Sequence, residues 1–105
     1  MAAGTPENTV GPSRRPARSL TIDLYSSRFD VHCIRAKGLF DRKGLHYNEY
    51  DVESDVINRE MMLRRSGGKT SLPQIFINGR FVGGFEELSR LIDSGELDAY
   101  MEGPA

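Results

Sequence analysis

The spacing of apolar and polar residues predicts a strand followed by a helix in the first part of the chain. From Ser19 to Tyr25 the two kinds of residue alternate, which is the period of a half-buried strand. Asp30 is a suitable N-cap for a helix that runs from Val31 to Asp41, with Gly44 as the stop. The apolar positions of this helix share one face: Cys33, Ala36, Leu39 and Phe40.

The second part of the chain continues with a strand, a helix and a hairpin. A strand is predicted from His46 to Val52, and a helix follows from about Asp55 until Gly67-Gly68. Gln74 to Ile77 is a short apolar run rich in strand formers, and Asn78-Gly79 favours a tight turn with positive φ at both residues.

A last helix is predicted from Phe85 to about Ile92. It breaks around Ser94-Gly95 and resumes over residues 96–101. The order is therefore β-α-β-α-β-β-α. The strand–helix–strand start implies a right-handed crossover between parallel strands, and the hairpin adds antiparallel strands. We expect an α/β fold with a four-stranded mixed sheet flanked by helices.

Composition narrows the class of protein. The chain has 105 residues, a formal net charge of −1 and a single cysteine, Cys33. This length corresponds to one domain, and the balanced charge argues against nucleic-acid binding. No apolar run is long enough for a membrane span, and one cysteine cannot form an internal disulfide. We expect a monomer in the cytoplasm that binds neither nucleic acid nor membranes.

Residues 1–18 differ in composition from the rest. They hold three of the five prolines and a basic cluster of Arg14, Arg15 and Arg18. Such a segment cannot bury enough apolar surface to order itself, which predicts a disordered leader before a domain at 19–105. Glu7 and the lack of amphipathic periodicity weigh against a transit peptide.

The stretch around the hairpin also carries candidate chemistry. Pro73 stands at the start of a strand, where a missing N–H is tolerated. Gly83-Gly84 precedes the helix that starts at Phe85. A glycine pair in this place lets an anionic ligand approach the free backbone N–H groups of the helix start.

Together these residues resemble the glutaredoxin family of the thioredoxin-like fold. Ser71 to Ile77 looks like the family's Thr-Val-Pro-Gln-Ile-Phe-Ile segment. Gly83-Gly84 and Glu86-Glu87-Leu88 look like its Gly-Gly-x-Asp-Asp-Leu segment. The resemblance extends from about Leu20 to Met101.

The resemblance implies a glutathione site. The Leu72–Pro73 bond is expected to be cis, and Leu72 to offer its backbone N–H and C=O to the cysteine part of glutathione. The γ-glutamyl carboxylate would meet the N–H groups of Phe85 and Glu86. Arg64 would reach the glycine carboxylate, with Ser71 beside it. The implied glutathione residues are Ser71, Leu72, Pro73, Gly84, Phe85, Glu86 and Arg64.

The family's Cys-Pro-Tyr-Cys motif aligns with Asp30-Val31-His32-Cys33. Asp30 thus stands at the position of the nucleophilic cysteine, and a carboxylate cannot attack a disulfide sulfur. Asp30 is otherwise a plain helix cap, and Cys33, at the resolving position, is otherwise a small core residue. No metal is expected, because His32, Cys33 and His46 are too scattered and the cluster-binding thiolate is missing.

These residues leave three functions open. The first is a glutathione-dependent thiol–disulfide oxidoreductase with weak activity, at most, through Cys33. The second is a redox-inactive module that binds glutathione, a glutathionylated protein or another partner. The third is a protein adaptor that uses a surface unrelated to the groove.

Overall fold

The computed structural model describes residues 20–100. The predicted leader, residues 1–18, lies outside this range. The elements in chain order are β2 (Ile22–Ser26), α1 (Val31–Arg42), β3 (Asn48–Asp51), α2 (Val56–Ser66), β4 (Gln74–Ile77), β5 (Arg80–Gly83), α3 (Phe85–Ser94) and a 3₁₀ helix, η1 (Glu96–Tyr100). Within the described range, no helix has the length and apolar character needed to cross a membrane.

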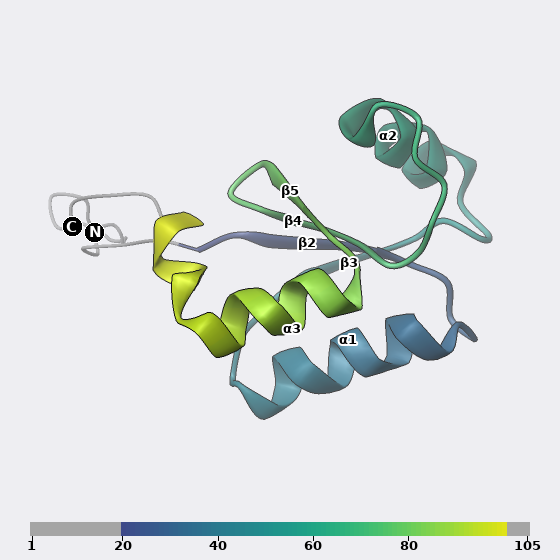
Figure 1. Ribbon diagram of the computed structural model, residues 1–105. Coiled ribbons are helices and arrows are strands. Elements are labelled where there is room, and N and C mark those ends of the chain that lie inside the picture. Colours follow the sequence, from purple (N-terminus) through teal and green to yellow (C-terminus); the bar gives the residue numbers. More distant parts are fainter. Residues whose placement is uncertain (1–19, 101–105) are drawn as a thin grey trace, which may run out of the picture.

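The four strands form one mixed sheet in the order β3-β2-β4-β5. β2 and β3 are parallel, whereas β4 is antiparallel to both β2 and β5. Helices α1 and α3 lie together on one side of the sheet, and α2 lies on the other (Figure 1). This arrangement confirms the predicted element order and the four-stranded mixed sheet.

Alternate residues of the central strands supply two cores, one on each face of the sheet. Leu24 and Ile75 belong to the larger core, with Phe40 from α1 and Leu88 from α3. Tyr25, Val52 and Phe76 belong to the smaller core beneath α2, together with Met62. The predicted apolar face of α1 is fully confirmed, because the four residues Cys33, Ala36, Leu39 and Phe40 are all buried.

The prediction that the first strand is half-buried was wrong. β2 begins at Ile22 rather than Ser19, and Tyr25 and Ser26 are buried along with the apolar residues. β2 is an interior strand with helices over both faces, so the polar positions of its alternating pattern are covered as well.

The second strand is shorter than predicted from His46 to Val52. Residue pairing runs from Asp23↔Asn48 to Ser26↔Asp51, and β2 itself starts only at Ile22. His46 therefore has no strand residue beside it with which to continue the ladder.

The sequence correctly predicted where two helices end and where the hairpin turns. Gly67 ends α2 and Gly95 ends α3, each with positive φ. Asn78 and Gly79 have φ of +50° and +81°, which confirms the predicted turn. The predicted resumption after Gly95 is a 3₁₀ helix that ends at Tyr100 within the described range.

Candidate functional site

The start of α1 is closed by the side chain of Asp30. Its Oδ1 atom accepts hydrogen bonds from the backbone N–H groups of His32 at 2.8 Å and of Cys33 at 3.1 Å. The first N–H groups of a helix have no carbonyl partner within the helix and carry a partial positive charge. Asp30 therefore fills this end with a permanent anion, as the prediction of an N-cap required.

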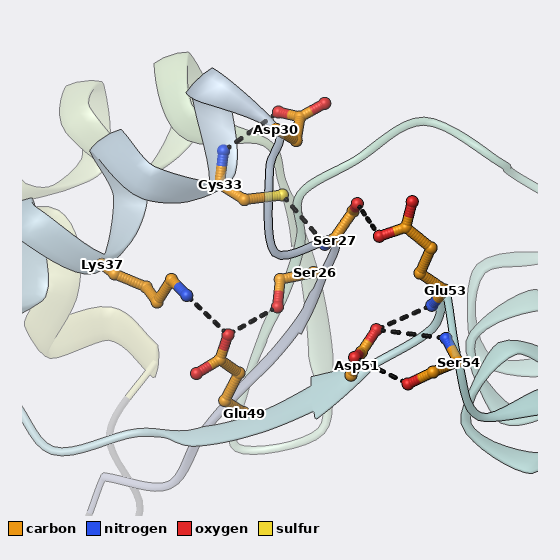
Figure 2. A network of polar contacts seen from close by, with 9 residues as sticks. All are labelled: Ser26, Ser27, Asp30, Cys33, Lys37, Glu49, Asp51, Glu53 and Ser54. Carbon is orange, nitrogen blue, oxygen red and sulfur yellow. Dashed lines mark hydrogen bonds and ion pairs between the residues drawn. The ribbon is translucent and has the colours of Figure 1, made fainter.

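Cys33 lies behind this cap, with its sulfur turned toward the end of β2 (Figure 2). It is fully buried, and its Sγ accepts a hydrogen bond from Ser27 N–H at 3.4 Å. Burial raises the pKa of the Cys33 thiol to about 11. The hydrogen bond from Ser27 N–H lowers this pKa by less than burial raises it, the charge of Asp30 raises it further, and Lys37 has the smallest, lowering effect. At pH 7 a thiol with this pKa is ionised in about one molecule in 10⁴.

A groove of about 210 Å³ opens between the starts of α1 and α3 and the loop before β4. It unites six of the seven residues that the resemblance implied for glutathione. The residues that line it are His32, Ser71, Leu72, Pro73, Gly84, Phe85, Glu86 and Glu87.

The loop before β4, which forms one wall of the groove, is anchored by a buried side chain. The Leu72–Pro73 peptide bond is cis, and Pro73 is buried. The buried Gln74 donates from Nε2 to the carbonyl oxygens of Lys69 at 2.8 Å and Ser71 at 3.1 Å. These two bonds fix the path of the backbone that leads up to Leu72.

The opposite wall is the start of α3, where the N-cap is Gly84 and no side chain covers the helix end. Glu87 reaches back so that its Oε1 accepts the Gly84 N–H at 2.8 Å, and this bond lowers the pKa of the Glu87 carboxyl. The N–H groups of Phe85 and Glu86 are first-turn groups without a carbonyl partner in the helix. Both residues line the groove.

A glycine is needed at Gly83 so that the side chain of Glu87 can reach the start of α3. Its φ is +126°, and a Cβ atom there would lie 2.9 Å from Cγ of Glu87. Any side chain at this position would therefore displace Glu87 from the helix start.

Arg64 is not among the residues that line the groove. It is exposed in the last turn of α2, so its contact with a glycine carboxylate stays a prediction. The neighbouring Arg65 is engaged instead with the sheet. It donates to Asp23 at 3.1 Å and to the hydroxyl of Tyr25 at 3.0 Å, and it lies 4.2 Å from the ring centroid of Phe76.

A second cleft, of about 390 Å³, shares no lining residue with this groove. Its lining residues are Ser26, Arg28, Lys37, Glu49 and Asp51. Glu49 pairs with Lys37 at 2.8 Å and also accepts the Ser26 hydroxyl at 2.8 Å (Figure 2). Because Ser26, Lys37 and Glu49 already bond to one another, the smaller groove is the better candidate for a ligand.

Sequence reasoning did not assign two residues of the groove to the ligand site. His32 was weighed only as a metal ligand, and Glu87 only as part of a family segment. The helical period could have suggested His32, because the second residue of a helix lies beside the helix start. Between residues 20 and 100, no three His, Cys, Asp or Glu side chains are grouped in a way that could hold a metal ion.

The comparisons with known proteins agree with this geometry. A family model described as Glutaredoxin matches residues 22–82. The chain belongs to the glutaredoxin family. A probable glutaredoxin of Synechocystis sp. is 40% identical over 82 residues, which cover 78% of this chain and 93% of that protein.

Solved glutaredoxin structures share the fold. The solution structure of glutaredoxin from Brucella melitensis has a TM-score of 0.62 at 39% identity, and the match covers 75% of this chain and 85% of that one. The crystal structure of a buckwheat glutaredoxin–glutathione complex has a TM-score of 0.64 at 24% identity, with 72% and 71% covered. The thioredoxin-like fold of this glutaredoxin-family chain is thereby established.

Proposed function

We propose that this glutaredoxin-family chain binds glutathione or glutathionylated proteins in the groove between α1 and α3. We further propose that it acts as a cytoplasmic monomer and that thiol–disulfide exchange through Cys33 is very slow at most. The observation that carries the proposal is the groove itself, which unites six of the seven residues implied by the family resemblance.

Each part of glutathione has a matching group in this proposal. The backbone of Leu72 pairs with the cysteine part of the ligand, in the way that an added strand pairs with a sheet edge. The γ-glutamyl carboxylate accepts hydrogen bonds from the N–H groups of Phe85 and Glu86, where the helix dipole favours an anion. The absence of a side chain at Gly84 leaves room for this approach.

The proposed loss of activity follows from the two residues at the start of α1. A thiolate must attack the glutathione sulfur of a mixed disulfide, form a new S–S bond and release the partner's thiolate. The carboxylate of Asp30 cannot take this role. Cys33 is a thiol in all but about one molecule in 10⁴ at pH 7, since the pKa of Cys33 is about 11, and its sulfur is buried.

Titration with reduced and with oxidised glutathione, followed by backbone NMR, tests the binding part. We expect shifts clustered at Leu72, Phe85 and Glu86, while residues of the second cleft such as Glu49 stay unmoved. No shifts at millimolar glutathione would contradict the proposal and would favour a protein-interaction role.

Turnover of a glutathionylated peptide by the wild type and by Cys33→Ser tests the second part. We expect both rates to equal the rate without protein. Fast turnover in the wild type that is lost in Cys33→Ser would show that Cys33 is a working nucleophile.

A further inference from the structure

The charges that line the groove are unusual for a site that takes an anion. Glutathione carries two carboxylates and one ammonium group at neutral pH. Glu86 and Glu87 both line the groove, and the bond from Gly84 N–H lowers the pKa of the Glu87 carboxyl, so this carboxylate stays ionised. The helix start of α3 therefore presents N–H groups and negative side chains to the same ligand.

One lining residue can oppose this negative charge. Among the eight residues that line the groove, His32 is the one whose side chain can become a cation. It is the second residue of α1 and is exposed, and it stands across the groove from Glu86 and Glu87. The loop wall of Ser71, Leu72 and Pro73 contributes no ionisable group.

Other cations near the start of α1 are directed elsewhere. Arg28 and Lys37 line the second cleft, and Lys37 is paired with Glu49 at 2.8 Å. Arg64 does not line the groove either.

We propose that His32 is the specificity-determining residue of the groove and that its protonated imidazole attracts the anionic ligand. This inference rests on the proposed glutathione site and adds a residue and a pH dependence to it. Histidine is the side chain whose charge ordinarily changes between pH 5 and 8. Binding is then stronger where His32 is charged and weakens as the pH rises.

The groups around His32 act in opposite directions. The N-terminal end of α1 disfavours a cation at its second residue. Asp30, which accepts the backbone N–H of His32 at 2.8 Å, favours the cation, and so do Glu86 and Glu87 across the groove.

The expected effect is modest because the site is open to water. Two unit charges about 4 Å apart in water interact by about 1 kcal/mol, which corresponds to about a fivefold change in affinity. We therefore expect the dissociation constant to be about three- to fivefold lower at pH 5.5 than at pH 8 in low salt, and the difference to shrink as salt is added.

The experiment is calorimetric titration with S-methylglutathione, a probe without a thiol that could titrate in this range. His32→Asn should bind equally at both pH values, with the weaker affinity that the wild type shows at pH 8. His32→Lys should bind equally at both, with the stronger affinity. Repeating the wild-type titration near pH 6.5 in two buffers of different ionisation enthalpy should show proton uptake, which His32→Asn should lack.

The other histidine of the chain provides the matched control. His46 precedes β3 and lines a separate cleft with Leu20 and Tyr47, near the N-terminal ends of β2 and β3, whereas α1 starts after the C-terminal end of β2. His46→Asn should keep the pH dependence of the wild type.

The outcomes separate this inference from the proposed function. Binding with the same pH dependence in the wild type and in His32→Asn would overturn the role of His32 and leave the glutathione groove intact. If the wild type bound the probe equally at both pH values, the role of His32 would also be overturned and the glutathione groove would again remain intact. Absence of binding in all variants would overturn the groove and this inference together.

Discussion

The starts of α1 and α3 are both helix N-termini at the groove, yet they are built in opposite ways. At α1, the Asp30 carboxylate accepts two backbone N–H groups, at 2.8 and 3.1 Å. At α3, the N-cap is Gly84, and the only side chain that reaches back in the described structure is Glu87, which takes the N–H of Gly84 itself. Asp30 thus takes the N–H groups of the second and third residues of α1, whereas Glu87 takes the N–H of the N-cap residue of α3 and leaves those of Phe85 and Glu86 for the proposed ligand.

This difference separates binding from chemistry within one fold. A helix start with free N–H groups can hold a ligand carboxylate or stabilise a thiolate. α3 keeps the first ability in the arrangement that we propose for glutathione. In the function that we propose, α1 lacks the second, because a carboxylate caps its start and Cys33 is a buried thiol with a pKa of about 11.

The largest expected effect is that of Asp30→Cys, which replaces the capping carboxylate at the start of α1 by a thiol. A thiol at a helix N-terminus has a lowered pKa and is largely ionised at pH 7, whereas Cys33 is ionised in about one molecule in 10⁴. Nucleophilicity falls as the pKa falls, so the net gain in rate is about 100-fold rather than 10⁴-fold. The rate at which the variant and the wild type turn over a glutathionylated peptide at pH 7 measures this gain.

Asp30→Ser is the control for this change. Serine keeps a capping oxygen but supplies no thiol, so we expect it to remain inactive. A wild type as fast as Asp30→Cys would show that the closed helix start does not limit the chemistry.

A smaller effect concerns stability at alkaline pH. The pKa of Cys33 is raised from an ordinary value of 9.0 to about 11 in the folded chain, mainly by burial. Between pH 9.0 and about pH 11, the thiol has lost its proton in the unfolded chain but keeps it in the folded chain. The free energy of unfolding therefore falls as the pH rises, by up to about 1.4 kcal/mol per pH unit and by about 2.7 kcal/mol in all.

Urea unfolding of the wild type and of Cys33→Ala from pH 8 to 11 measures this contribution. Cys33→Ala also loses packing at every pH, but its stability should fall less steeply with pH because it has no thiol to titrate. Parallel pH profiles for the two proteins would mean that the thiol is not protected by burial.

The smallest expected effect is the loss of stability when a helix N-cap is removed. Asp30→Ala should lower the free energy of unfolding by about 1 kcal/mol. Asp55→Ala should cost about the same, because Asp55 caps α2 through bonds of 2.9 and 3.1 Å to the N–H groups of Ile57 and Asn58. Only Asp30→Ala should also lower the pKa of Cys33 and speed its reaction with a disulfide reagent, since the charge of Asp30 raises that pKa. Equal reaction rates in the two variants would show that Asp30 acts on α1 as a cap alone.

The sequence by itself predicted the features that depend on neighbouring residues. The cap Asp30, the turn at Asn78-Gly79 and the helix ends at Gly67 and Gly95 are local signals, because each depends on a hydrogen bond or a positive φ within a few residues. The buried face of α1 and the four-stranded mixed sheet followed from periodicity and element order. Most of the groove followed from the family resemblance.

Only the tertiary structure decided which side chains meet. His32 lines the groove and Arg64 does not, because the starts of α1 and α3 meet there and the end of α2 does not. The complete burial of Tyr25 depends on α2 lying over β2. The raised pKa of Cys33 depends on the desolvation produced by elements distant in the chain. Periodicity gives a residue's direction from its own element, but contacts and desolvation are set by what packs against it.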